Sequence, residues 1–121
     1  MRIGIIDLGT NSVRFDVHQV NKNGEDLLLH REKLMIRLGQ GVFLKGRLDP
    51  SAIRRAIQAF RSFHQTAKLL QAQKVIAFGT SALREASDAE AFVALIHKRT
   101  GIEIRIISGD EEAQLIAAGV L

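Results

Sequence analysis

The sequence contains no cysteine, which excludes disulfide bonds and zinc sites built from thiolates. It also lacks tryptophan and tyrosine, so its core has to be built from aliphatic side chains and six phenylalanines. No apolar run approaches the roughly 18 residues that a membrane span needs, and no basic segment followed by an apolar stretch indicates a signal peptide. We therefore expect a cytoplasmic protein that makes no contact with membranes.

The sequence also lacks a strong excess of charge of either sign. The 121 residues carry 17 Lys and Arg against 13 Asp and Glu, a net charge of +4, and the basic residues form no block. This distribution does not favour nucleic-acid binding, whereas a mild positive bias suits a small anionic substrate. The length fits one domain, and 46% hydrophobic residues suffice for a core.

The stretch 3–15 carries the first candidate site. An apolar run of strand length ends at Asp7, Gly9 is expected to turn the backbone with a positive φ, and a second alternating strand begins at Val13. The amides and hydroxyls of Gly9, Thr10, Asn11 and Ser12 suit a phosphate, and Asp7 offers a hard oxygen for Mg²⁺. The other interpretation is an ordinary hairpin turn, because neither a Walker loop nor a dinucleotide fingerprint is present.

A third strand is expected within 25–38, after the turn at 21–24, and completes an antiparallel meander. Two glycines in three residues predict a loop with unusual dihedral angles at 38–42. Arg37, at the edge of that loop, is either a solvated strand-end charge or a contact to an anion. Further on, Asp49 as N-cap and Pro50 at the first position predict a helix that runs to Leu70.

The apolar run 74–78 predicts a buried strand that pairs in parallel after a right-handed crossover. Thr80 and Ser81 follow its carboxyl end, where ligands of α/β sheets gather. Arg84 comes one turn later. It forms either a surface ion pair with Glu85 or Glu112, or a contact to an anion.

Two further helices are predicted. Ser87 and Glu90 read as a capping box for a helix to residue 100, and a fifth strand follows at 102–107. Ser108 and Glu111 form a second capping box, which leaves Glu112 free of the cap. The last helix, 113–121, is apolar nearly all round and is expected to be buried on several sides. We therefore expect a chain that belongs to something longer or binds a partner, and association into a homodimer is equally compatible.

The predicted element order βββαβαβα, with a five-stranded mixed sheet, is that of the ribonuclease-H-like half-domain of the actin, Hsp70 and sugar kinase superfamily. Four motifs, in order and across the whole chain, resemble the exopolyphosphatase / guanosine pentaphosphate phosphohydrolase family. These motifs are Asp-Leu-Gly-Thr-Asn-Ser at 7–12, Arg-Leu-Gly-Gln-Gly at 37–41, Gly-Thr-Ser-Ala-Leu-Arg-Glu-Ala at 79–86 and Ile-Ser-Gly-Asp-Glu-Glu-Ala at 107–113.

The resemblance implies a role for each matching residue. Asp7 resembles the acid that organises Mg²⁺ or another hard divalent cation, and residues 9–12 resemble the first phosphate loop. Arg84 resembles the arginine that holds phosphate across the cleft, and Glu112 matches the catalytic base. The family's second glycine-rich phosphate loop is absent from this sequence. We expect this chain to be the first of two half-domains and to form one side of the cleft.

The implied activity is removal of terminal phosphate from inorganic polyphosphate. Guanosine pentaphosphate presents the same phosphoanhydride and is the near alternative. A rival of another class is a nonenzymatic phosphate- or ATP-binding module of an actin-like protein. All three interpretations require the loops that carry Asp7, Thr80, Arg84 and Glu112 to converge at one edge of the sheet.

Overall fold

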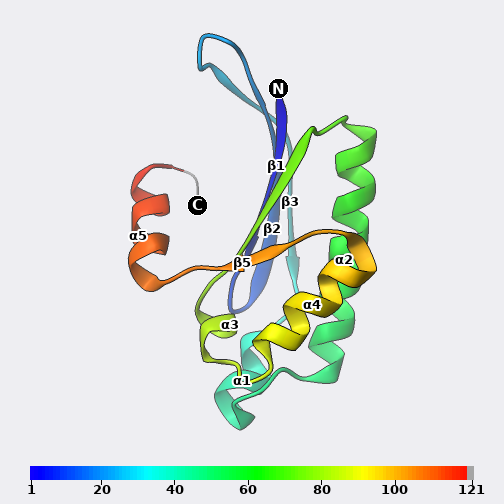
Figure 1. Cartoon of the computed structure of the whole chain (residues 1–121), viewed down its shortest axis with the longest axis vertical. Helices are drawn as coiled ribbons and strands as arrows, with labels where there is room; N and C mark the ends of the chain where they lie inside the picture. Colours follow the sequence, from blue (N-terminus) through cyan, green and yellow to red (C-terminus); the bar gives the residue numbers. More distant parts are fainter. Residues whose placement is uncertain (120–121) are drawn as a thin grey trace.

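A computed structural model of the protein describes residues 1–119. Five strands form one sheet in the order β3-β2-β1-β4-β5 (Figure 1). No helix within these residues has the length and apolar character needed to cross a membrane. The elements are β1 (Arg2–Leu8), β2 (Ser12–Val20), β3 (Asp26–Met35), α1 (Gly39–Lys45), α2 (Pro50–Leu69), β4 (Lys74–Gly79), α3 (Ser81–Glu85), α4 (Ala89–Thr100), β5 (Ile104–Ile106) and α5 (Gly109–Ala117).

The sheet has the mixed topology that the sequence predicts. β1 and β2 pair antiparallel with Leu8 opposite Val13, and β3 adds antiparallel to β2 with a register shift after Val17. β4 then pairs with β1 in parallel, with Ile6 opposite Ala77, and β5 follows in parallel at the edge. The meander and the parallel pairing of β4 are therefore confirmed, and the carboxyl ends of β1, β4 and β5 lie at the same edge of the sheet.

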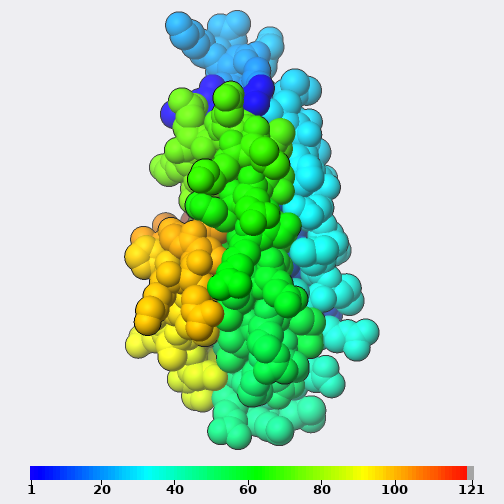
Figure 2. Space-filling model, turned by 90° about the vertical axis from the view of Figure 1, so that its right-hand side faces the viewer, coloured from blue at the N-terminus to red at the C-terminus, as the bar shows by residue number. Residues whose placement is uncertain are grey.

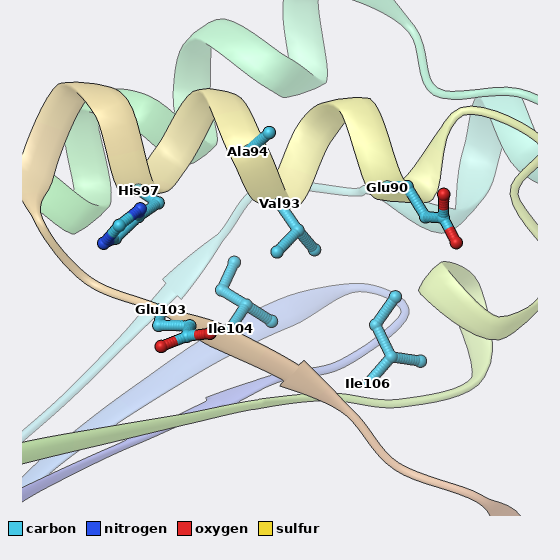
Figure 3. A pocket seen from close by; sticks show the side chains of 7 residues that line it. All are labelled: Glu90, Val93, Ala94, His97, Glu103, Ile104 and Ile106. Atoms are coloured by element: carbon cyan, nitrogen blue, oxygen red, sulfur yellow. The ribbon is translucent and has the colours of Figure 1, made fainter.

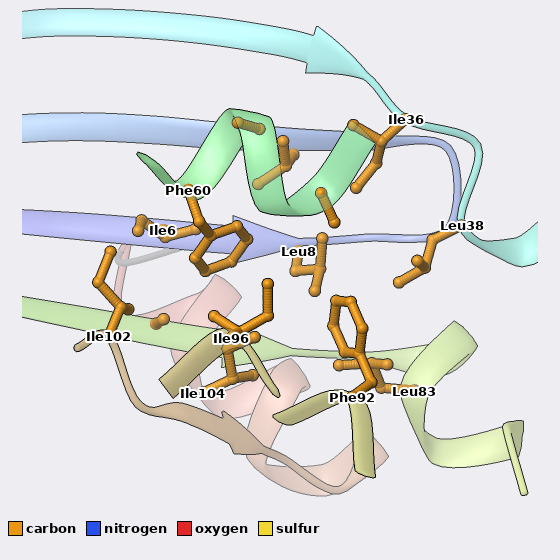
Figure 4. Close-up of a cluster of buried hydrophobic side chains, with 14 of the residues drawn as sticks. Ile6, Leu8, Ile36, Leu38, Phe60, Leu83, Phe92, Ile96, Ile102 and Ile104 are labelled. Atoms are coloured by element: carbon orange, nitrogen blue, oxygen red, sulfur yellow. The ribbon is translucent and has the colours of Figure 1, made fainter. Parts of the chain in front are cut away.

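The hydrophobic core lies between the sheet and the two long helices. α2 and α4 cover one face of the sheet, and α5 lies on the opposite face (Figure 1). Phe15 from β2 stacks on Phe63 from α2 with ring centroids 4.8 Å apart. Each fully buried side chain of this size contributes about 1.5–3 kcal/mol by leaving water. Figure 4 shows Ile6 and Leu8 of β1 facing Phe60 and Ile96 across this core, all of them at most 1% exposed.

At the surface of this layer, α2 runs between α4 and β3 along the length of the molecule (Figure 2). Its helical repeat of small and aromatic residues faces the sheet, as predicted from the sequence. The buried residues of α2 are Ala52, Ala56, Ala59, Phe60, Phe63 and Ala67.

The predicted loop at 38–42 is instead part of a helix, α1. Its glycines allow close packing, because a Cβ on Gly39 would lie 2.4 Å from Thr10 Cγ2 and one on Gly41 would lie 2.7 Å from Asp49 Cγ. The unusual backbone angle falls one step earlier, at Arg37, with φ of 52°. Contacts that are remote in sequence therefore explain these two glycines better than turn geometry does.

This close approach predicts that Gly39→Ala destabilises the protein by about 1–3 kcal/mol, the usual cost of overpacking. Gly109→Ala is the matched control, because Gly109 also begins a helix and a Cβ there meets nothing within 4 Å. Urea unfolding of both variants measures the difference. Equal stability of the two variants would show that the packing of Thr10 against α1 does not need the space at Gly39.

One short helix was not predicted, and another helix begins at a different residue from the one predicted. The short helix α3 has no counterpart among the predicted elements, and α4 begins at Ala89 with Asp88 rather than Ser87 as its N-cap. The predicted capping box of Ser87 and Glu90 is therefore wrong. The physical reason is tertiary: the Ser87 amide donates to Gly46 O at 2.8 Å, and Asp88 Oδ1 accepts from the Leu48 amide at 3.1 Å. The chain here is held by the loop after α1.

The helix α5 also differs from expectation, because none of its residues from Gly109 to Ala117 is buried. Ile116 is 56% exposed. The prediction of burial on several sides is wrong for this chain, since only one face of the helix turns toward the sheet (Figure 1). Val120 and Leu121, the end of the predicted helix, lie outside the described residues.

Candidate active site

The loop 9–12 between β1 and β2 is tied down through its carbonyl groups. The amides of Ile36 and Arg37 both donate to Asn11 O, at 3.0 and 2.8 Å, and the Gly39 amide donates to Thr10 O at 2.8 Å. Within residues 1–119, the amides of Thr10 and Asn11 have no acceptor. The loop therefore keeps its acceptors occupied and offers its donors, an arrangement that suits an anion.

Gly9 closes this loop in a different way from the prediction. Its amide donates to Ser12 O at 3.0 Å, and the glycines with positive φ in the described chain are Gly24, Gly46, Gly101 and Gly119. The expected positive φ at Gly9 is therefore wrong. A Cβ there would lie 3.3 Å from Ser12 O, so tight closure of the turn is what disfavours a side chain.

The end of β4 meets the loop through a pair of hydroxyls. Thr10 Oγ1 and Ser81 Oγ lie 2.9 Å apart, which joins two segments 71 residues apart in sequence. Thr80 is only 5% exposed, and its hydroxyl donates to Leu8 O at 3.3 Å. This placement argues against the phosphate contact predicted for Thr80, because its donor is used to hold β4 against β1.

Arg84 and Glu112 form an ion pair at the same edge. Arg84 Nη2 lies 3.0 Å from Glu112 Oε1, and Arg84 Nη1 donates to Ile107 O at 2.8 Å. The predicted capping box begins α5: the Glu111 amide donates to Ser108 Oγ at 3.1 Å, and Glu111 accepts from the Ser108 amide at 3.3 Å. Glu112 is free of the cap, as predicted, and its carboxylate turns to Arg84.

Asp7 is the acid at the end of β1, opposite Arg14 in the register of β2. Burial raises the pKa of the Asp7 carboxyl above its ordinary value. The positive charge of Arg14 lowers this pKa, and the negative charges of Glu112 and Asp16 raise it again. The negative charge of Glu112 therefore disfavours the ionised form of Asp7, a repulsion that a divalent cation would relieve.

The donor set suits Mg²⁺ better than a transition metal. No group of three or more His, Cys, Asp or Glu side chains that could hold an ion occurs within residues 1–119. Mg²⁺ usually takes one or two carboxylates and completes its shell with water and substrate phosphates. Asp7, with Glu112 nearby, fits this pattern.

Arg14 is a neighbour of Asp7 that the sequence pattern did not identify. Its Nε lies 3.4 Å from Asp16 Oδ2, and Asp16 is 2% exposed and clamped by Arg31 at 2.9 and 3.0 Å. Alternation along β2 does place Arg14 and Asp16 on one face, but only the pairing with β1 brings them to Asp7. The cluster fixes a positive charge beside the candidate metal ligand.

The remaining predicted residue, Arg37, adjoins the loop 9–12, because its amide donates to Asn11 O. It lines a hollow of about 330 Å³ together with Thr10 and Asn11. The loops that carry Asp7, Thr80, Arg84 and Glu112 thus converge at the carboxyl edge of the sheet, as the sequence predicts. The role of each side chain stays a prediction.

Another hollow, of about 360 Å³, lies between α4 and β5 and contains none of the predicted site residues (Figure 3). Val93, Ile104 and Ile106 line it with apolar surface, and the carboxylates of Glu90 and Glu103 lie at its rim. Apolar walls and two acids do not suit a phosphate, so this hollow is not the candidate site.

The comparison with known proteins decides the family. The sequence profile of the Ppx/GppA phosphatase family matches residues 18–121. The chain belongs to the Ppx/GppA phosphatase family. Among curated Ppx/GppA-type relatives, Exopolyphosphatase 2 of Mycobacterium tuberculosis is 34% identical over an alignment 128 residues long, gaps included, that covers 99% of this chain.

Solved structures of the Ppx/GppA family agree with this fold. The Aquifex aeolicus family member superposes with a TM-score of 0.93 at 28% identity, and an exopolyphosphatase from Cytophaga hutchinsonii with 0.93 at 33%. Each match covers 99% of this chain but only 39% and 38% of the other. The chain spans 33% of the length of Exopolyphosphatase 1 of Mycobacterium bovis and 40% of that of Exopolyphosphatase 2 of Mycobacterium tuberculosis. It has the actin-like, ribonuclease-H-like half-domain fold.

Proposed function

We propose that this chain is the N-terminal half-domain of a hydrolase that removes terminal phosphate from inorganic polyphosphate. The observation that carries the proposal is the convergence of three parts at one edge of the sheet. These parts are a loop with free amides at Thr10 and Asn11, a guanidinium at Arg84 and a carboxylate at Glu112. The relatives named exopolyphosphatase support this substrate.

In the proposed reaction, the loop 9–12 holds the terminal phosphoryl group through amides and hydroxyls, and Arg84 clamps it. Glu112 accepts a proton from water as the water oxygen bonds to phosphorus. The bridging P–O bond then breaks, and the electron pair stays on the shortened polyphosphate. Little covalent work is asked of the protein, because phosphoryl transfer depends mainly on positioning and charge stabilisation.

Asp7 would hold Mg²⁺ or a similar hard cation, with Glu112 nearby. When bound, such a cation supplies charge neutralisation for the phosphate oxygens. Arg14, fixed by Asp16, keeps the surroundings of Asp7 from becoming too negative for an anionic substrate.

The ion pair between Arg84 and Glu112 implies an order of events at this site. Arg84 cannot clamp phosphate with the same nitrogen that holds Glu112, so the anion and the carboxylate compete for it. A partly exposed pair of this kind contributes about 1 kcal/mol or less, so phosphate displaces it at modest cost. Binding of substrate then frees Glu112 to act on water.

The second half-domain, supplied by a longer parent protein, would close the cleft and add the second phosphate loop. The 121-residue chain alone is therefore expected to fold and to release phosphate at least about a hundredfold more slowly than the parent, since one side of the transition-state contacts is missing. Homodimer formation and a cytoplasmic location stay predictions.

Malachite-green measurement of phosphate release, with polyphosphate, guanosine pentaphosphate and ATP compared side by side, tests the assignment. The parent should prefer polyphosphate. A preference for guanosine pentaphosphate would change the assigned substrate but keep the reaction, which is hydrolysis of a terminal phosphoanhydride. Exclusive hydrolysis of ATP would contradict the proposal, and so would vigorous release by residues 1–121 alone.

A further inference from the structure

Arg37 is held beside the phosphate loop in a strained backbone conformation. Its φ of 52° makes it one of two non-glycine residues with positive φ in the described chain, the other being Gln71 at 57°. The left-handed region costs such a residue roughly 1–2 kcal/mol. On either side of it, Ile36 and Leu38 are buried at 2% and 0% exposure. The Arg37 side chain is therefore forced outward from a fixed backbone.

Two adjoining hollows share Arg37 as a common wall. The inner hollow, of about 330 Å³, contains Thr10 and Asn11 of the phosphate loop. The outer hollow, of about 510 Å³, extends from Arg37 to Ser51 and Arg55 at the start of α2. Gln40 and Met35 line both hollows, so an extended ligand can pass from one to the other along Arg37.

The outer hollow is predominantly polar and carries two cations, of which Arg55 is held in place by hydrogen bonds. Arg55 donates through Nε and Nη2 to Ile36 O, at 3.1 and 2.8 Å, which fixes its guanidinium and leaves Nη1 for another acceptor. The Arg37 side chain has no hydrogen-bond acceptor within residues 1–119. Asp49 also lines the hollow, so the net charge of the ionised side chains that line it is +1.

We propose that the outer hollow is a second anion subsite, formed by Arg37, Gln40, Ser51 and Arg55, which binds the internal phosphates of a polyphosphate whose end occupies the loop 9–12. This inference rests on the proposed function and adds to it a preference for long chains. Donors spaced along a groove suit a linear polyanion with a negative charge on every unit. A short phosphate ester or tripolyphosphate fills only the inner hollow.

The test is isothermal titration calorimetry of the 121-residue chain with long-chain polyphosphate and with tripolyphosphate. Calorimetry is needed because the chain has no Trp or Tyr to report binding. Arg37→Gly should weaken binding of the long chain by about tenfold, the usual loss for one hydrogen bond to a charged group. Its affinity for tripolyphosphate should fall less, because that ligand reaches Arg37 only from the inner hollow and glycine keeps the backbone amide that holds Asn11.

Two controls separate the subsite from other effects. Gln71→Gly relieves the same backbone strain far from the site, and Arg54→Gln removes an exposed charge from the residue next to Arg55. Both should bind either ligand as the unaltered chain does. If Arg54→Gln weakens the long chain as much as Arg37→Gly does, binding is nonspecific and the subsite is overturned.

A second variant distinguishes this inference from the proposed function. Ser81→Ala, which removes the hydroxyl partner of Thr10, should weaken tripolyphosphate and long-chain binding equally. If Ser81→Ala has no effect while Arg37→Gly acts on the long chain alone, the inner site is wrong and the outer subsite stands. If only Ser81→Ala acts, the outer subsite is wrong and the proposed function stands.

Discussion

Replacing Glu112 by glutamine in the parent protein is expected to lower kcat for phosphate release by roughly 10²–10⁴-fold, the contribution of a general base. The same change should strengthen binding of tripolyphosphate to the 121-residue chain by about fivefold, because the neutral amide no longer competes as an anion for Arg84. If substrate binding releases Glu112 from Arg84 so that Glu112 can act as the base, the variant should bind tripolyphosphate more tightly and turn over more slowly.

Calorimetry and malachite-green kinetics on the same variants measure the two effects. Asp110→Asn is the charge-matched control, because Asp110 lies two residues away on α5 and is exposed. It should change neither quantity by much. Turnover that survives Glu112→Gln would contradict the assignment of the base. An equal gain of affinity in Asp110→Asn would show that the gain comes from the loss of any negative charge on α5 and not from the release of Arg84.

Replacing Asp7 by asparagine is expected to have opposite effects on stability and on activity. Burial, followed by the charges of Glu112 and Asp16, raises the pKa of Asp7 in the folded protein above its ordinary value of 3.8, and Arg14 offsets part of this rise. Well below pH 3.8 the carboxyl is protonated in both folded and unfolded chains. As the pH rises through the raised pKa, the folded state loses stability relative to the unfolded chain, which ionises more easily. The neutral amide of the Asp7→Asn variant avoids this loss.

The Tm of Asp7→Asn should therefore exceed that of the unaltered chain at pH 7, and the difference should shrink as the pH falls toward 3.8. Added Mg²⁺ should raise the Tm of the unaltered chain only, through ligand linkage. In the parent, Mg²⁺-dependent phosphate release should fall at least about a hundredfold, because charge neutralisation is lost. Glu103→Gln, at an exposed carboxylate, is the control for thermal melting. A variant that is less stable at pH 7 would contradict this account of Asp7.

The local patterns of the sequence identify most of the sheet and the strongest helix. The alternation of Val13, Phe15 and Val17 marks β2, and the repeat from Ile53 to Leu70 marks α2, because burial on one face imposes a period on the chain. The capping box of Ser108 and Glu111 is confirmed for a related reason, since both partners lie within one turn. Such features depend on neighbours in sequence and can be recognised there.

The failures share the opposite property. Gly39 and Gly41 look like loop residues but belong to α1, because Thr10 and Asp49 approach them from elsewhere in the chain. Ser87 looks like a cap, but its amide is bound by Gly46 O. The hydrogen bond from the Thr80 hydroxyl to Leu8 O likewise could not be foreseen from the local pattern, and the phosphate contact of Thr80 stays a prediction.

By itself, the sequence determined the strands, the long helix, the family and the residue types at the candidate site, since each depends on periodicity or on short motifs. Only the tertiary structure decided which donors remain free. In the folded chain, the carbonyls of Thr10 and Asn11 accept hydrogen bonds, whereas their amides have no acceptor within residues 1–119. Arg84 is paired with Glu112, and Arg37 lies between two hollows. The physical reason is that a hydrogen bond satisfied by a residue far away along the chain leaves no trace in the local pattern.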